Sequence, residues 1–262
     1  MNFASLMEVA IKAAVDSGTV LIEHYGKVKT QKTKESLRDV VTEVDQMSES
    51  AVLTVLNEKT PSFGVLTEEK GFLGPESTDY WVVDALDGTI NYIHQIPLFC
   101  VSIAFVKNGV PVVSAIYNPL AEDLYYGADG VGAFKNQSRL SVSEISISEA
   151  VMAGAFSGKA RSPMNRPNEF QIFGKINDLS QGCLRTGSAG MNLAYVAEGK
   201  FGGCWGTANK VWDVAAGLHL ADLAGAQIYQ KSMEDGLLKS YVAAAPKCFE
   251  VLLDQVKPII ST

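Results

Sequence analysis

The segment from Trp81 to Thr89, WVVDALDGT, constrains the fold of this chain more than any other. Two carboxylates, Asp84 and Asp87, stand three residues apart, directly after an apolar run and directly before Gly88-Thr89. A strand end holds ligands rigidly, and two aspartates there with a backbone carbonyl between them form an oxygen-rich pocket that suits Mg²⁺. The Gly88 and Thr89 amides can open a helix, whose N-terminus accepts phosphate. The segment therefore predicts a strand, a turn and a helix that bring metal and phosphate together, which indicates phosphoryl chemistry.

Composition narrows the class of protein and of partner. A chain of 262 residues, 47% of them hydrophobic, can form one large domain or two intimately packed halves with a sizeable core. Its net charge of −7 argues against binding to the phosphate backbone of nucleic acid. An acidic protein that binds an anionic substrate needs metal ions to reverse the local sign of charge. Nucleic acid is therefore not an expected partner, and the phosphoryl chemistry that the opening segment indicates favours a small phosphorylated metabolite instead.

Cysteine usage and the apolar runs bear on the compartment. The four cysteines are widely spread without a CxxC motif, so we expect reduced, mostly buried thiols. The N-terminus has no basic stretch followed by an apolar core, so no signal peptide is expected. The apolar runs are shorter than the roughly 20 residues of a membrane span. These features predict a cytoplasmic protein that does not associate with membranes.

The first half, residues 1–143, reads as helices over an antiparallel sheet. Helical spacing predicts helices at 3–25 and 45–58, and the lysine-rich stretch 27–38 between them looks like a mobile loop or loose hairpin. A short strand is expected at 63–67. Asn108-Gly109 inside 101–118 is a strong hairpin signal, and a second strand pair is expected at 121–135.

The second half, residues 144–262, reads as an α/β layer, and the two halves are expected to form one compact catalytic unit. Arg161–Asn168, with two prolines, is the expected surface loop. Predicted strands lie at 151–156, 226–229 and 240–244, and predicted helices at 189–198, 212–224 and 246–257.

Further carboxylates fit the opening segment. Glu68, with Glu69, ends an apolar run as Asp84 does, Asp213 lies in the first turn of a predicted helix, where the dipole favours a carboxylate, and Asp45 precedes another helix. Each of these residues also has an ordinary structural interpretation. Glu68 and Glu69 alone would be a solvated pair, Asp213 an N-cap and Asp45 a helix cap. Asp84 and Asp87 alone would be turn formers. A single site explains all of them together. The three histidines, which lie in no nucleophile motif, are interpreted as structural: His24, His94 and His219.

Three motifs carry a family resemblance. W-x-x-D-P-[LI]-D-G-T-x-N-F, followed by a proline and a serine-containing strand, stands at 81–92, at Pro97 and at 101–104. W-D-x-A-A-G with a later A-G-[GA] stands at 212–217 and 224–226, and R-T-G-[SA]-A at 185–189. From about residue 5 to residue 255 the chain resembles the inositol monophosphatase family of Mg²⁺-dependent, lithium-sensitive phosphatases.

The resemblance implies a fold and a set of metal ligands. The fold would be α+β, a layered α-β-α-β-α sandwich of the inositol monophosphatase and fructose-1,6-bisphosphatase type, commonly a homodimer, with two to three Mg²⁺ per active site between the halves. The first ion would be held by Glu68, Asp84 and the carbonyl of Leu86. The second would be held by Asp84, Asp87 and Asp213, and a third, looser ion would lean on Glu68 and waters.

The resemblance also implies catalytic and substrate-binding roles. Thr89 would orient the attacking water with Asp45 as its hydrogen-bond partner, and Glu68 completes the catalytic set. Two ions about 3.5–4 Å apart clamp an in-line phosphoryl transfer, which needs no covalent intermediate. Lys34 matches a lysine of the family's mobile loop, and Asp39 has no ligand role. The implied substrate-binding residues are Gly88, Thr89, Asp87, Ala189, Asp213 and Gly206.

The chain departs from the family pattern at several positions. Ala85 replaces the motif proline, so we expect a somewhat looser loop, and Tyr92 mildly replaces phenylalanine. Gly206 stands where members that prefer inositol phosphate carry an acidic residue that binds substrate hydroxyls, and its loss removes a specificity element. Trp205 beside it could pack on a sugar or base. Lys210 lines the same approach and is interpreted as a solvated lysine.

Three functions remain open from the sequence. The first is a Mg²⁺-dependent phosphomonoesterase acting on inositol monophosphate or a related polyol phosphate. The second is the same fold and mechanism on fructose 1,6-bisphosphate, adenosine 3′,5′-bisphosphate or histidinol phosphate. The third is a weakly catalytic protein that acts by binding partners such as transcription machinery. The complete ligand set argues against a pure scaffold, and residues 89–92 with Pro97 look more like the inositol and fructose branch.

Overall fold

A computed structural model of the chain describes residues 2–29, 31–33, 40–156, 166–232 and 238–260. The helices are α1 (Phe3–His24), α2 (Glu43–Lys59), α3 (Thr89–Ile93), the 3-10 turn η1 (Ile147–Glu149), α4 (Arg166–Leu179), α5 (Ala189–Ala197), α6 (Val211–Leu223) and α7 (Pro246–Ile260). The strands of the first half are β1 (Gln31–Thr33), β2 (Val40–Thr42), β3 (Gly64–Thr67), β4 (Gly71–Leu73), β5 (Asp79–Asp87), β6 (Cys100–Lys107), β7 (Val110–Asn118), β8 (Asp123–Ala128), β9 (Gly132–Lys135) and β10 (Ser138–Arg139). Those of the second half are β11 (Val151–Phe156), β12 (Gly182–Leu184), β13 (Gly203–Lys210), β14 (Gln227–Ser232) and β15 (Leu238–Ala244).

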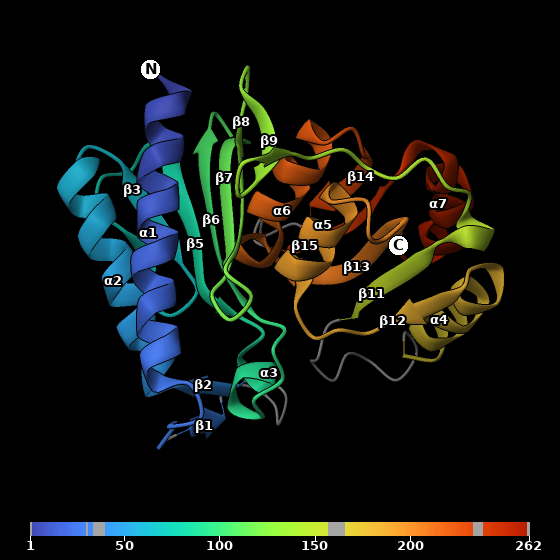
Figure 1. Cartoon of the computed structure of the whole chain (residues 1–262), viewed down its shortest axis with the longest axis horizontal. Coiled ribbons are helices and arrows are strands. Elements are labelled where there is room, and N and C mark those ends of the chain that lie inside the picture. The colour runs from blue at the N-terminus through green and yellow to red at the C-terminus, as the bar shows by residue number, and fades with distance from the viewer. Residues whose placement is uncertain (1, 30, 34–39, 157–165, 233–237, 261–262) are drawn as a thin grey trace.

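The elements stack in five layers (Figure 1). Helices α1 and α2 cover the outer face of an eight-stranded sheet, and α5 and α6 lie against its inner face. A five-stranded sheet follows, with α4 and α7 on its far side. The expected α-β-α-β-α sandwich is therefore confirmed.

The two sheets differ in the direction of their strands. The larger sheet has the order β10-β9-β8-β7-β6-β5-β3-β4, and of its pairs only β3 with β5 is parallel in the described chain. The smaller has the order β12-β11-β13-β15-β14, with β11 parallel to both of its neighbours. The expected antiparallel first half and α/β second half are confirmed, and the exceptional parallel pair β3–β5 is the one that carries the predicted ligands. The chain passes between the sheets in residues 140–150, and a division at 143/144 stays a prediction.

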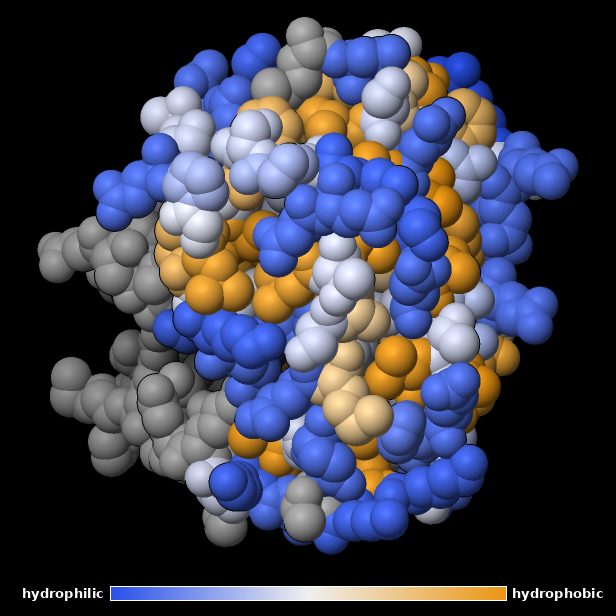
Figure 2. Space-filling model, turned by 90° about the vertical axis from the view of Figure 1, so that its left-hand side faces the viewer, coloured by the Kyte–Doolittle hydropathy of each residue, from blue (hydrophilic) through white to orange (hydrophobic). Residues whose placement is uncertain are grey.

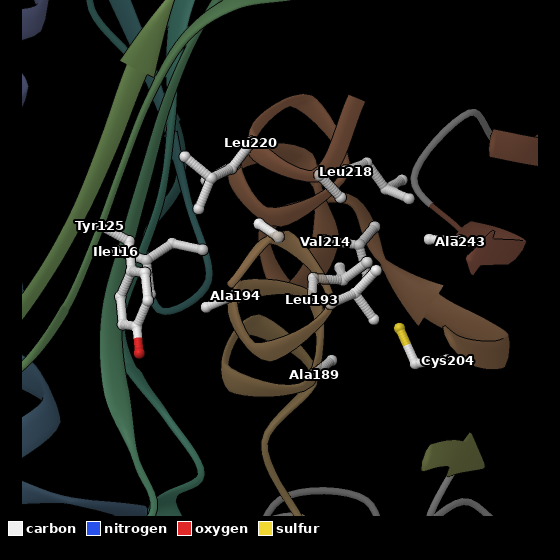
Figure 3. Close-up of a cluster of buried hydrophobic side chains, with 14 of the residues drawn as sticks. Ile116, Tyr125, Ala189, Leu193, Ala194, Cys204, Val214, Leu218, Leu220 and Ala243 are labelled. Carbon is white, nitrogen blue, oxygen red and sulfur yellow. The ribbon is translucent and has the colours of Figure 1, made fainter. Parts of the chain in front are cut away.

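Alternation along the strands separates three hydrophobic cores. One lies between α1, α2 and the larger sheet, and another between the smaller sheet, α4 and α7. The central core joins both sheets through α5 and α6. Figure 3 shows Leu193, Val214 and Leu218 packed between Ile116 of the larger sheet and Cys204 of the smaller one. All four cysteines are buried and free, as expected.

The outer layer is amphipathic. On the face where α1 and α2 lie, hydrophilic residues are interspersed with small hydrophobic areas (Figure 2). The exposed hydrophobic side chains of these helices include Val15, Ile22 and Met47. Within the described chain, none of the helices has the length and apolar character needed to cross a membrane.

Some elements match the sequence-based expectation and others differ from it. Of the two alternatives for the lysine-rich stretch, the antiparallel pairing of β1 with β2 supports the loose hairpin, while Lys34 and Asp39 lie outside the described residues. The loop expected at 161–168 is wrong at its end, because α4 begins at Arg166, and 161–165 lie outside the described residues. The helix α4 and the strands β12 and β13 were not predicted.

Candidate active site

Glu68 and Asp84 meet because β3 and β5 are parallel neighbours. Thr67 at the end of β3 is in register with Val83, so the next residues along the two strands, Glu68 and Asp84, follow the same edge. Asp84 is only 3% exposed, and its Oδ1 accepts a hydrogen bond from Leu86 N at 3.0 Å. The pairing of β5 with β6 shifts in register between Asp84 and Asp87, so the strand is irregular at the predicted ligands.

Asp87 joins the end of β5 to the start of α5. Its Oδ2 accepts hydrogen bonds from Ser188 Oγ at 2.6 Å and from Gly190 N at 2.7 Å. Ser188 is also the N-cap of α5, and its Oγ accepts from Met191 N. Burial raises the pKa of Asp87 to about 6, although the Ser188 and Gly190 bonds favour its charged form. The site thus spans two elements 101 residues apart in the sequence.

Asp213 reaches the same place from the first turn of α6. Its Oδ2 accepts a hydrogen bond from Lys210 N at 2.8 Å, so Asp213 also contributes to the N-terminal cap of α6. Ser102, the β6 residue opposite Asp84, donates through Oγ to Trp212 O at 3.4 Å. This bond places the start of α6 beside Asp84.

The carboxylates act on one another electrostatically. Burial raises the pKa of Asp84 well above its ordinary value, and the charges of Glu68, Asp87 and Asp213 raise it further. Burial, followed by Glu68 and Asp87, likewise raises the pKa of Asp213. Like charges so placed oppose ionisation unless a cation joins them. These four carboxylates form the acidic site.

In the described part of the chain, no three His, Cys, Asp or Glu side chains already form a group that could hold a metal. One oxygen each of Asp84, Asp87 and Asp213 is held by a hydrogen bond within the protein. Carboxylate and carbonyl oxygens are nevertheless the donors that Mg²⁺ prefers, and the mutual repulsion of the group fits a cation. The residues of the acidic site therefore fit a divalent cation.

Thr89 and Asp45 lie at the edge of the acidic site. Thr89 Oγ1 is 3.1 Å from both Asp45 Oδ1 and Leu86 O, and its single hydrogen can serve one of them at a time. Asp45 is 5% exposed and caps α2 through Thr42 N and Thr42 Oγ1. Gly88 has φ +91°, a left-handed conformation that favours glycine, and it turns the chain from β5 into α3.

Gly206 is covered by neighbouring side chains. A Cβ atom there would lie 2.2 Å from Asn209 Oδ1 and 2.5 Å from Tyr241 Cε1, so even alanine would force a shift. The interpretation of Trp205 as a stacking surface is wrong. Its side chain faces the other side of β13, is fully buried, and packs against Phe156 with ring centroids 4.7 Å apart.

The remaining predicted residues lie nearby. The backbone of Ala189 favours the charged form of Asp87, and its contact with substrate stays a prediction. Lys210 is partly buried, with Nζ 5.7 Å from the Trp212 ring centroid, rather than fully solvated. Ala85 is buried, and its carbonyl accepts from Ser48 Oγ at 2.9 Å. Sequence reasoning missed Ser48 and the role of Ser188, although an N-cap signal preceded α5.

The chain resembles known proteins over nearly its whole length. The sequence profile of the Inositol monophosphatase family matches residues 2–261. The chain belongs to the inositol monophosphatase family. It is 34% identical over 269 residues to an inositol-1-monophosphatase of Mesorhizobium japonicum, covering 100% of this chain and 99% of the relative. It is also 34% identical to Nus factor SuhB of Pasteurella multocida, covering 98% and 97%.

Solved structures of the family share the fold. The inositol monophosphatase from Anabaena superposes with a TM-score of 0.86 at 32% identity, covering 98% of this chain and 97% of that one. A second, an IMPase/NADP phosphatase complexed with Mg²⁺ and phosphate, has a TM-score of 0.77 at 25% identity, covering 91% and 90%. Members of the family therefore bind Mg²⁺, and names within it range from phosphatase to Nus factor.

Proposed function

We propose that this protein is a Mg²⁺-dependent phosphomonoesterase that hydrolyses inositol monophosphate or a related polyol phosphate. The observation that carries the proposal is the convergence of Glu68, Asp84, Asp87 and Asp213, whose burial and mutual charge raise the pKa values of Asp84 and Asp213. A buried group of like charges is costly to a protein unless a cation binds it.

The donor set suits two to three Mg²⁺ ions. Glu68, Asp84 and the carbonyl of Leu86 would hold the first ion, and Asp84, Asp87 and Asp213 the second. A third, more loosely held ion would be coordinated by Glu68. Bound Mg²⁺ supplies an activated water and neutralises charge on the phosphoryl and leaving-group oxygens.

The side chains of Asp45 and Thr89 would orient the attacking water. When Thr89 Oγ1 donates its hydrogen to Asp45 Oδ1, its lone pairs remain to accept a hydrogen bond from water. The amides of Gly88 and Thr89 would bind phosphate oxygens. Hydrolysis requires positioning and charge stabilisation from these residues and no covalent intermediate.

The substrate is the finer part of the proposal. The acidic contact to inositol hydroxyls is replaced by Gly206, over which Asn209 Oδ1 lies. Asn209 Oδ1 and Tyr241 Oη are buried and accept or donate no hydrogen bond within the described residues. Because both atoms are buried, neither reaches a substrate hydroxyl, and the preference for inositol phosphate rests on the 34% identity to an inositol-1-monophosphatase. Inositol 1-phosphate therefore leads over the bisphosphates.

The test is phosphate release near neutral pH, with and without Mg²⁺. The panel is inositol 1-phosphate, fructose 1,6-bisphosphate, adenosine 3′,5′-bisphosphate and histidinol phosphate, each with wild type and Asp84→Asn. We expect Mg²⁺-dependent release that is greatest for inositol 1-phosphate and about a thousandfold slower in the variant. Millimolar lithium should inhibit it. A different preferred substrate would reassign the specificity, and no release from any substrate would contradict the phosphatase proposal.

A second candidate is partner binding. The observation favouring it is the 34% identity, over nearly the whole of both chains, to a protein named Nus factor SuhB. If Asp84→Asn binds transcription machinery as strongly as wild type does but loses phosphate release, partner binding is separate from catalysis. The homodimer also stays a proposal, which sedimentation velocity tests directly.

A further inference from the structure

The helix α2 carries a polar stripe where an amphipathic helix normally buries apolar side chains. Asp45, Ser48 and Glu49 lie at positions i, i+3 and i+4, on one face of the helix. Their exposed fractions are 5%, 0% and 1%. A buried serine and a buried glutamate are unusual on such a face and require polar partners. The partners of Ser48 and Glu49 include backbone groups in the two turns that follow Asp84 and Glu68.

Ser48 holds the turn that contains Asp84. Its Oγ donates to Ala85 O at 2.9 Å and is 2.6 Å from Ser17 Oγ. A hydroxyl has one hydrogen, so Ser17 must be the donor to Ser48 when Ser48 donates to Ala85. Ala85 lies between two predicted ligands, where the pairing of β5 with β6 is irregular. The bond therefore fixes the backbone at a point that the sheet leaves unsupported.

Glu49 holds the turn that contains Glu68. Its Oε2 accepts from Glu69 N at 3.2 Å, and its Oε1 is 3.1 Å from Lys70 Nζ. Thr67 Oγ1 accepts from Lys70 N at 3.1 Å and closes the same turn. The carboxylate of Glu49 thus binds the residue next to Glu68 from the side of α2.

We infer that Ser48 and Glu49 are positioning residues, which hold the Asp84 and Glu68 turns at the separation that a shared Mg²⁺ needs. The inference rests on the proposed function for the identity of the ion. Repulsion between Glu68 and Asp84 tends to spread the two turns, and two hydrogen bonds from one rigid helix oppose that movement. Groups that orient metal ligands in this way contribute strongly to metal affinity.

Calorimetric titration of the metal-free protein with Mg²⁺ alone tests the inference. The variants are Ser48→Ala, Glu49→Ala and Glu49→Gln, whose amide oxygen can still accept from Glu69 N. Ser17→Ala is the control for Ser48, because it removes the same serine pair and keeps the bond to Ala85. Glu58→Ala is the control for Glu49, because Glu58 is an exposed glutamate on α2 with its own lysine, Lys59, at 2.7 Å.

We expect Ser48→Ala and Glu49→Ala to weaken Mg²⁺ binding about tenfold or more, and Glu49→Gln, Ser17→Ala and Glu58→Ala by less than about threefold. Unchanged binding in both alanine variants would overturn the inference, as would Glu49→Gln binding as weakly as Glu49→Ala. Thermal melting without metal checks folding. If Glu49→Ala fails to fold, the Ser48→Ala and Ser17→Ala pair decides. Wild type that binds Mg²⁺ but releases no phosphate would contradict the proposed function and leave this inference standing.

Discussion

The larger sheet and α6 together carry two groups of polar side chains that differ in how their charges are balanced. In the acidic site, Asp84, Asp87 and Asp213 gather like charges at the end of β5. Away from it, His219 of α6 places Nδ1 3.0 Å from Ser114 Oγ and Nε2 3.1 Å from Asp129 Oδ1. The second group has the residue types of a nucleophilic triad. Ser114 is fully buried, however, so it cannot meet a substrate.

A further group, whose charges are balanced, joins β8 and β9 to the end of α5. Tyr125 Oη donates to Glu198 Oε2 at 2.7 Å, and Lys135 Nζ lies 3.0 Å from Glu198 Oε1 and 2.8 Å from Asp123 Oδ2. Lys200 Nζ adds a contact of 2.9 Å to Glu198. Each acidic side chain here has a cationic neighbour from the chain itself.

The difference separates structural from functional polar groups. Where the chain supplies partners of opposite sign, as around Glu198, the group needs nothing more to be stable when buried. Where it supplies only further carboxylates, a cation from outside is the natural partner. Substitutions should therefore affect turnover in the acidic site and only stability in the balanced groups.

The largest effect is expected for Asp84→Asn and Asp213→Asn. Each removes a proposed metal ligand, and a loss of about 4 kcal/mol of charge stabilisation corresponds to about a thousandfold in rate. Without metal, both variants should melt no lower than wild type, because a neutral amide replaces a carboxyl whose pKa is raised by burial and its neighbours. Steady-state phosphate release and thermal melting measure the two effects. Near-normal Mg²⁺-dependent rates would show that the metal assignment is wrong.

The next effect concerns pH. Burial raises the pKa of Asp87 from 3.8 to about 6 in the folded metal-free protein. This shift corresponds to a difference of roughly 3 kcal/mol in the free energy of protonation between the folded and unfolded states. The folded state then binds the proton more tightly, so this stability is present below pH 3.8 and is lost as pH rises through about 6. Added Mg²⁺ should act in the opposite direction, because it binds the deprotonated carboxylates. Melting temperatures measured across this pH range, with chelator and with Mg²⁺, test the direction of both pH dependences. If the stabilisation by Mg²⁺ does not increase with pH, the assignment of Asp87 as a metal ligand is contradicted.

The local parts of this site could be predicted from the sequence. An apolar run followed by Asp84, Asp87 and Gly88 specifies a strand and a turn within a few residues, and Asn108-Gly109 specifies a hairpin. The helix predicted at 45–58 lies within α2, but its N-cap is Thr42, and Asp45 completes the capping box at the third helical position. The roles of Thr89 and Asp213 came instead from the family resemblance, since each reads alone as an ordinary turn or cap residue.

The long-range parts could not be predicted. The contact of Asp87 with Ser188 depends on two sheets packing through α5, which no local pattern encodes. The strand β13 is rich in small residues and lacks a clear alternation, so its register and the direction of Trp205 follow from pairing with β11 and β15. Ser48 and Glu49 look like ordinary polar helix residues until the turns that they bind are placed.

A smaller effect is expected for His219→Leu. It leaves Ser114 Oγ buried without this partner, so the free energy of unfolding should fall by about 2 kcal/mol while turnover stays unchanged. Burial lowers the pKa of His219, so its contribution to stability is present above pH 6.5 and is lost as pH falls, opposite in sign to Asp87. Denaturant unfolding at several pH values measures this, with His94→Gln, an exposed histidine, as control. A loss of turnover in His219→Leu would place this group in the active site.

The smallest effect is expected for Tyr125→Phe. The substitution removes one hydrogen bond to Glu198, but Lys135 and Lys200 still neutralise that carboxylate, so the free energy of unfolding should fall by only about 1 kcal/mol. Lys135→Met removes the cation instead and leaves Asp123 and Glu198 facing each other, so it should cost more than Tyr125→Phe. Chemical denaturation ranks the two, and phosphate release should be unaffected in both. Equal costs would mean that the balance of charge does not stabilise this network, and the contrast with the acidic site would then rest on metal binding alone.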